Sequence, residues 1–323
     1  MRSQSALLVD AGYLLAAAAT RLTGSSFRRS VNANYEKLVA ELIELVEQRS
    51  GLPILRVYWY DAGRSGIPDL DQERVAALPK VKLRLGRVGV EGEQKGVDLR
   101  IGLDMVSHSR KGSVDTIYLL SGDDDLTEAV EEAQAQGVQV VVLAVPTPTG
   151  AAHGVSKFLV RAADGVEVLE SRVLDSTISA AVTSLVPHPA KPGTESAVTK
   201  ATPGDLARRS PSTRPIPMPL AYSSGGSSSP YVAPEIQRDP EETTATIRTV
   251  VRKAYDAWLR SATEEQRQEL LTRRPTIPSE LDRALLVDLS EALGDYYLGD
   301  GMRVELRSKF WEAVEAAEKE DGA

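Results

Sequence analysis

The sequence has no cysteine among its 323 residues, and it has few histidines and no long apolar run. The absence of cysteine excludes disulfides, thiolate metal sites and cysteine nucleophiles, and is typical of a reducing compartment. The three histidines, His108, His153 and His188, lack the spacing of a zinc site. Asp10 and Gly12 interrupt the apolar opening, and no other segment approaches the roughly 20 apolar residues of a membrane span. These absences predict a cytoplasmic protein that makes no membrane contact.

The sequence also has fewer basic than acidic residues. The chain carries 38 Lys and Arg residues against 46 Asp and Glu residues, a net charge of -8. No global positive field therefore attracts nucleic acid, so any polyanion has to be held locally. Phosphate-binding loops are missing too, because "GRVGVEG" lacks Gly-Lys-Ser or Gly-Lys-Thr and no G-x-G-x-x-G follows the first apolar run. A nucleotide cofactor is not expected.

The first half of the chain alternates apolar runs with amphipathic patterns. We expect strands at 6–10, 54–61, 81–88, 115–121, 138–145 and near 165–169, with helices at 35–48, 70–78, 97–109 and 126–136 and around 154–163. The strands are continuously apolar instead of alternating, which is typical of a parallel sheet covered by helices on both faces. The pattern predicts an α/β domain over residues 1–175.

Composition changes sharply after this domain. Residues 187–238 are rich in Pro, Ser, Thr and Gly and hold too few apolar residues to offset the cost of ordering, so we expect a flexible, disordered linker. Residues 241–320 are helical in pattern throughout. One predicted helix places its apolar residues on a single stripe: Ile247, Val250, Val251, Ala254 and Trp258. This region is predicted to form a small all-α C-terminal domain.

Acidic residues follow the predicted strands. Asp10 and Asp61 end the first two, "SGDDDL" places Asp123 to Asp125 after the fourth, and Asp98 begins a helix that could face the same crevice. Ligands of open α/β sheets bind beyond the carboxyl ends of the strands. Crowded carboxylates raise the cost of ionising one another, which a cation relieves, and Mg²⁺ and Mn²⁺ prefer carboxylate oxygen. One or two such ions could activate a water for attack on a phosphodiester.

Several polar residues near this edge have two interpretations. Asp124 is expected to cap a helix instead of binding metal. Asp104 comes six positions after Asp98, so it turns away from the same helix face and is expected at the surface or behind the metal ligands. Asp61 belongs either to the rim of the crevice or elsewhere. Lys95 either contacts phosphate or pairs with a carboxylate.

Five segments occur in an order and spacing that resemble the NYN family, a branch of the PIN-like nucleases. They are "LLVDAGYLL", "RVYWYDAG", "QKGVDLRIGLDM", "LLSGDDDLTEAVEEAQAQGVQVVVL" and "VSKFLVRAADGVEVL", across residues 5–170. The resemblance implies a Rossmann-like PIN fold and a metal-dependent ribonuclease. By motif position it assigns the catalytic and metal-binding acids to Asp10, Asp98, Asp123 and Asp125. Ser121 matches the family loop, where it orients the metal surroundings or a phosphate, or forms a turn.

The chain departs from many relatives at "DAGYL", because they carry an Asn shortly after the first Asp.

The leading hypothesis is an RNA endonuclease dependent on Mg²⁺ or Mn²⁺, with Lys95, Arg28 and Arg29 contacting RNA. The alternative is a non-catalytic RNA- or protein-binding regulator that retains the fold. The C-terminal domain is expected to bind a protein or RNA partner, although its basic residues also suit a solvated face.

Overall fold

The computed structural model describes residues 3–63, 66–88, 94–181, 240–294 and 298–321. The predicted linker at 187–238 lies outside these residues. Residues Met1–Thr183 and Asp239–Ala323 belong to one compact unit. The domain limits inferred from composition stay predictions.

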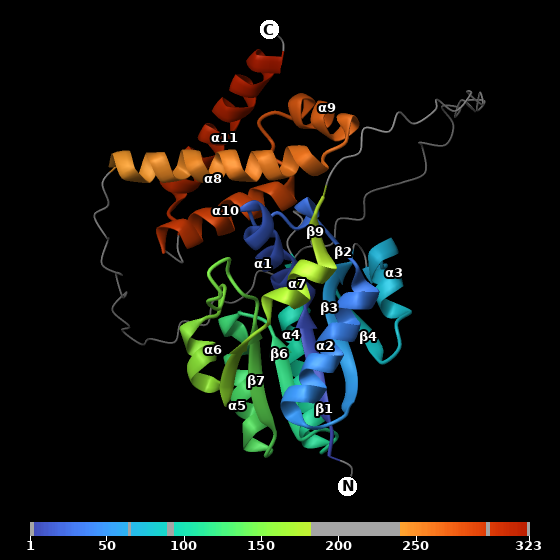
Figure 1. Ribbon diagram of the computed structural model, residues 1–323. Coiled ribbons are helices and arrows are strands. Elements are labelled where there is room, and N and C mark those ends of the chain that lie inside the picture. The colour runs from blue at the N-terminus through green and yellow to red at the C-terminus, as the bar shows by residue number, and fades with distance from the viewer. Residues whose placement is uncertain (1–2, 64–65, 89–93, 182–239, 295–297, 322–323) are drawn as a thin grey trace, which may run out of the picture. The chain divides into compact units, whose positions relative to one another are not determined.

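A seven-stranded sheet forms the centre of the N-terminal domain (Figure 1). Its strands lie in the order β5-β4-β3-β1-β6-β7-β8, and all neighbours are parallel except β4 and β5. The strands are β1 (Ser5–Asp10), β3 (Ile54–Gly63), β4 (Val81–Val88), β5 (Gln94–Lys95), β6 (Thr116–Leu120), β7 (Gln139–Ala144) and β8 (Gly165–Val168). Every residue of β1 and β6 is buried, as continuously apolar central strands require.

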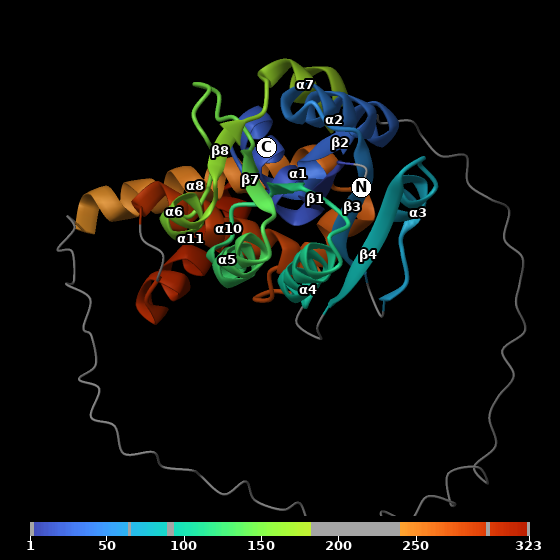
Figure 2. The same ribbon diagram turned by 90° about the horizontal axis from the view of Figure 1, so that it is seen from below.

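Helices cover both faces of this sheet (Figure 2). Against one face pack α1 (Ala11–Thr23), α2 (Tyr35–Ser50), α3 (Leu70–Ala76) and α7 (Ser171–Thr177). Against the other pack α4 (Val97–Arg110), α5 (Thr127–Ala135) and α6 (Lys157–Ala162). The predicted α/β class with a mostly parallel sheet is confirmed.

The strand order reverses beside β1. The chain moves from β1 outward to β3 and β4, and then returns to β6 on the other side of β1. Because Val9 pairs with Leu120, the residues that follow these two strands leave the sheet side by side. Asp10 and the segment from Ser121 therefore meet at the reversal point, where open α/β sheets bind their ligands.

Three short strands were not expected from the sequence. β2 (Val31–Ala33) pairs antiparallel with β9 (Ile178–Ala180), and β5 adds an antiparallel edge to β4. Segments of two or three residues carry too little periodicity to be identified, and the partner of β2 lies far along the chain. β9 lies beyond residue 175, and next to it the Ala181 N–H donates to the Ser30 carbonyl oxygen at 2.7 Å.

The described part of the C-terminal region consists of helices joined by short turns. They are α8 (Pro240–Ser261), α9 (Glu264–Thr272), α10 (Ser279–Leu293) and α11 (Asp300–Asp321). The predicted stripe on α8 is buried in their common core, and Phe27 of the N-terminal domain packs into this same core. The all-helical character of the region is confirmed. Among the described helices, none is long and apolar enough to cross a membrane.

Replacing Phe27 by Ala tests whether the two ends of the chain share a core. Phe27 is 4% exposed, so truncation leaves a cavity and should lower the free energy of unfolding by about 3–5 kcal/mol. Phe158→Ala is the matched control, because Phe158 is 54% exposed and its loss should cost less than about 0.5 kcal/mol. Denaturant unfolding of the full chain measures both. Equal losses would contradict the shared core.

Candidate metal centre

Asp10 is held at the junction of β1 and α1. It is the N-cap of α1, and its Oδ1 accepts a hydrogen bond from the Tyr13 N–H at 3.2 Å. Its Oδ2 accepts from the Ser121 hydroxyl at 3.3 Å. Burial raises the pKa of Asp10 from its usual 3.8 to about 6, and the negative charge of Asp98 adds to this rise. Asp10 is therefore a buried carboxylate that no cation among the described residues pairs with.

Ser121 connects this carboxylate to the loop after β6. Its side chain is fully buried, and while it donates to Asp10 it also accepts from the Asp123 N–H at 3.4 Å. Asp123 in turn is the N-cap of η3 (Asp124–Leu126), and its Oδ1 accepts from the Asp125 N–H at 3.1 Å. One hydroxyl thus fixes the loop relative to the end of β1.

Gly122 lets this loop lie against the neighbouring one. A Cβ at this position would stand 2.0 Å from the Gly154 carbonyl oxygen and 2.9 Å from a ring carbon of Tyr13. The Ser156 N–H donates to the Gly122 carbonyl oxygen at 2.9 Å. The Tyr13 hydroxyl completes the contact by donating to the His153 carbonyl oxygen at 2.6 Å. Only glycine at position 122 permits the two backbone segments at Gly122 and Gly154 to lie this close together.

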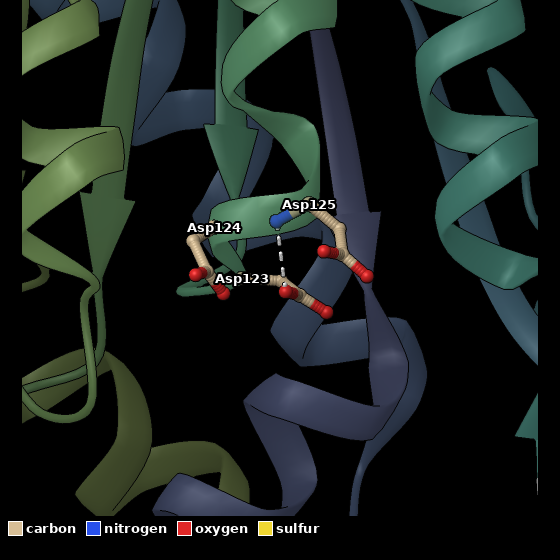
Figure 3. A group of neighbouring side chains, drawn as sticks. All are labelled: Asp123, Asp124 and Asp125. Atoms are coloured by element: carbon tan, nitrogen blue, oxygen red, sulfur yellow. Dashed lines mark hydrogen bonds between the residues drawn. The ribbon is translucent and has the colours of Figure 1, made fainter. Parts of the chain in front are cut away.

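Three consecutive carboxylates gather in this loop. Asp123, Asp124 and Asp125 each offer an oxygen within 4.8 Å of the others, a spacing that one cation can bridge. The carboxylates of Asp123 and Asp125 point the same way from the loop, with Asp124 beside them (Figure 3). The expected cap role of Asp124 is wrong, because Asp123 is the N-cap. An N-cap needs extended backbone before the first turn, and Asp123 has that conformation.

Asp98 approaches the loop from the first turn of α4. Burial raises its pKa, and so does the charge of Asp125. Burial likewise raises the pKa of Asp123, with further contributions from Asp98, Asp125 and Asp124. The four acids assigned by the family motif are therefore electrostatic neighbours. Asp10 and Asp98 nevertheless lie outside the group whose oxygens come within 4.8 Å.

Two other predicted acids are engaged elsewhere. Asp61 accepts from Gln72 Nε2 at 2.8 Å and pairs with Arg28 at 3.4 Å. Asp104 accepts from the Tyr60 hydroxyl at 3.0 Å and pairs with Arg84 at 2.9 Å. Asp61 thus contacts side chains of α3 and η1 (Arg28–Ser30), and Asp104 contacts side chains of β3 and β4. The expectation that Asp104 turns away from Asp98 stays a prediction.

The three residues predicted to bind substrate are Arg28, Arg29 and Lys95, and they lie in different surroundings. Arg28 lies in η1 (Arg28–Ser30) and pairs with Asp61, whereas Arg29 pairs with Glu280 of α10 at 2.7 Å. The side chain of Lys95 lies outside the part of the chain that the structure describes. Their contact with RNA stays a prediction.

Three residues of the site were missed at first. Tyr13 and Gly122 are adjacent to motif residues, and their spacing from Asp10 and Ser121 could have indicated them. Arg283 of α10 had no such signal, although its charge acts on Asp98. Its proximity results from packing of the C-terminal helices alone.

The donor set fits a hard divalent cation. All the candidate ligands are carboxylate oxygens, which Mg²⁺ and Mn²⁺ prefer over nitrogen or sulfur. Burial and mutual repulsion raise the pKa values of Asp10, Asp98 and Asp123, so the ionised cluster is destabilised until a positive charge is supplied. Asp123, Asp124 and Asp125 could hold one such ion, because each offers an oxygen within 4.8 Å of the others, whereas Asp10 and Asp98 lie outside that spacing.

Comparison with known proteins gives one matching family model and two similar proteins. The model of the family described as "NYN domain" matches residues 4–170, just over half of the chain. An uncharacterized protein of Sinorhizobium fredii, y4oD, is 39% identical over 80 residues, which are 25% of this chain and 37% of that protein. A crystal structure of a protein of unknown function from Vibrio parahaemolyticus is 20% identical to this chain, with a TM-score of 0.37. The match covers 53% of this chain and 95% of the Vibrio chain.

Replacing Asp10 by Asn should stabilise the metal-free protein at neutral pH. Because the pKa of Asp10 is raised in the folded protein, ionising Asp10 lowers the free energy of unfolding. This loss is absent below pH 3.8, grows between pH 3.8 and about pH 6, and is complete at higher pH. Asn keeps the N-cap, so we expect a gain of roughly 1–3 kcal/mol at pH 7.5 and little change at pH 4. Thermal unfolding in EDTA measures it. Asp69→Asn, which also preserves an N-cap, should change stability by less than about 0.5 kcal/mol. A destabilised Asp10→Asn protein at pH 7.5 would refute this account.

Adding a methyl group at Gly122 should disturb the loop. Gly122→Ala forces the Gly154 backbone to move and should cost about 1–3 kcal/mol or more. Gly165→Ala is the control, since a Cβ there meets nothing within 4 Å. Midpoints of urea unfolding compare the two. If both variants match the parent, the close approach at Gly122 is not a constraint.

Proposed function

The chain belongs to the NYN domain family, a branch of the PIN-like nucleases, and from this membership we propose that it is a ribonuclease dependent on Mg²⁺ or Mn²⁺. Asp10, Asp98, Asp123 and Asp125 are the proposed metal ligands, and RNA is the proposed substrate. The observation that carries the proposal is the gathering of several carboxylates at the strand-order reversal.

The residues of the chain prepare this site in three ways. The Ser121 hydroxyl orients the Asp10 carboxylate, and the η3 backbone orients Asp123 through the Asp125 N–H. Partial burial of Asp98 and Asp123 lowers the local dielectric, which strengthens their attraction for a cation. A divalent ion bound there would activate a water and stabilise the leaving oxygen of a phosphodiester.

A non-catalytic RNA- or protein-binding regulator is the second candidate. Both carboxylate oxygens of Asp10 already accept hydrogen bonds, from Tyr13 and Ser121, so Asp10 has a structural role without any metal. The family Asn is also missing from "DAGYL". Calorimetric titration with Mn²⁺ separates the candidates, because a regulator of this kind does not need a metal in the acidic cluster.

Asp123→Asn should abolish RNA cleavage. It removes one charge from the cluster but keeps an oxygen that can accept from the Asp125 N–H, so the loop remains folded. We expect at least a roughly 100-fold lower rate on labelled single-stranded RNA with Mn²⁺, together with weaker Mn²⁺ binding.

Asp71→Asn is the matched control for that variant. Asp71 is an exposed acid that pairs with Arg74, and its replacement should leave the rate unchanged. Structured tRNA and single-stranded DNA belong in the same substrate panel. Equal cleavage by Asp123→Asn and the parent would assign the activity to another site or to a contaminant.

A further inference from the structure

Helix α10 of the C-terminal domain lies against the loops that surround the acidic cluster. Glu280 pairs with Arg29 at 2.7 Å, and Asp288 Oδ1 accepts from the Ser26 N–H at 2.9 Å in a buried hydrogen bond. Further along the helix, Glu291 Oε1 lies 3.4 Å from His153 Nε2. These contacts fix one face of α10 on the N-terminal domain over about three turns.

Arg283 follows Glu280 by three residues, so the two side chains are neighbours on the helix, at the edge of that face. Protein atoms around its guanidinium lower the pKa of Arg283, and so does the neighbouring charge of Arg28, although the side chain stays exposed to solvent. The charges of Asp10, Asp98 and Asp123 act in the opposite direction. A cation from the C-terminal domain therefore faces the acids of the candidate metal centre.

This cation does not neutralise the acids by direct contact. Within the described part of the chain, the Arg283 side chain makes no hydrogen bond or ion pair. A residue that blocked the site would pair with the carboxylates, as Arg29 pairs with Glu280. An arginine kept unpaired opposite an anionic cluster has donors available for a further anion.

We propose that Arg283 contacts the scissile phosphate of bound RNA, so that the C-terminal domain completes the active site within the same chain. This inference rests on the proposed ribonuclease function. A guanidinium binds phosphate oxygens through two parallel hydrogen bonds and remains charged at every working pH. Placed opposite the carboxylates, it would hold the phosphate against the metal side and stabilise its developing charge.

Two nearby arginines of the N-terminal domain are already engaged. Arg28 is paired with Asp61, and Arg29 is paired with Glu280. The chain as a whole carries a charge of -8, so a phosphate near the acidic cluster needs a local positive partner. The helical domain was expected to bind a protein or RNA partner, whereas the position of Arg283 gives it a part in the reaction itself.

The test compares Arg283→Ala and Arg283→Lys in the full chain. We expect Arg283→Ala to lower kcat/KM on single-stranded RNA about 100-fold, with Arg283→Lys in between because it keeps the charge but loses the two parallel hydrogen bonds. Mn²⁺ should bind at least as tightly as to the parent, since a repelling charge has been removed. RNA binding is measured without cleavage, in Asp123→Asn proteins with and without Arg283→Ala. Adding Arg283→Ala should make the slope of log affinity against log salt concentration less steep by about 0.7, as expected for the loss of one phosphate contact.

Arg273→Ala is the control, because Arg273 is an exposed arginine of the same domain that pairs with Glu269. It should leave cleavage and the salt slope unchanged. Higher activity in Arg283→Ala would identify Arg283 as a block on the site and overturn the proposal. Unchanged cleavage and an unchanged slope would overturn it as well.

Failure of the ribonuclease proposal gives a different result. In that case the parent does not cleave RNA in Mn²⁺, whatever residue occupies position 283. If it still binds RNA, a smaller salt slope in Arg283→Ala supports the phosphate contact without catalysis. If the parent neither cleaves nor binds RNA, both proposals are rejected.

Discussion

Repulsion between buried carboxylates is the constraint on which this structure depends. Asp10 is 9% exposed, burial and the charge of Asp125 raise the pKa of Asp98, and burial and the charge of Asp98 raise the pKa of Asp123. Side chains that repel would separate unless the backbone held them in place. The parallel pairing of β1 with β6 does so, because it ends both strands at the same level of the sheet. An unstable arrangement of charge that a rigid scaffold maintains is typical of a site that awaits a cation.

The surroundings of the cluster add rigidity at short range. The Ser121 hydroxyl binds Asp10 and the loop backbone together, and Gly122 permits the loop to contact Gly154 without an intervening side chain. Tyr13 ties the first turn of α1 to the carbonyl oxygen of His153. These contacts involve different elements, so the positions of the acids follow from the packing of the whole domain edge. A metal site of carboxylates needs this support, since its ligands repel before the ion arrives.

The C-terminal helices place a local positive charge in a chain whose net charge is negative. A protein with a charge of -8 has no general attraction for RNA, and the helical domain looked like the part that would supply one. In the structure its contribution is more specific. Phe27 of the N-terminal domain is buried in the helical core, and α10 carries Arg283 toward the acids. One positive charge of the helical region therefore acts on the acidic cluster, and we propose that it contacts a phosphate there.

The sequence alone determined the main strands, their parallel arrangement and the order of the acidic motifs, because continuous apolar runs and short motifs are local properties of a chain. It also placed Asp10 and Asp123 at strand ends, although their roles as ligands stay predictions. Only the tertiary structure decided that Asp61 binds Gln72 and Arg28, that Asp104 binds Tyr60, and that β2 pairs with β9. It alone brought Arg283 to the site. These partners are distant in sequence, and no periodicity encodes a contact that depends on how separate elements pack.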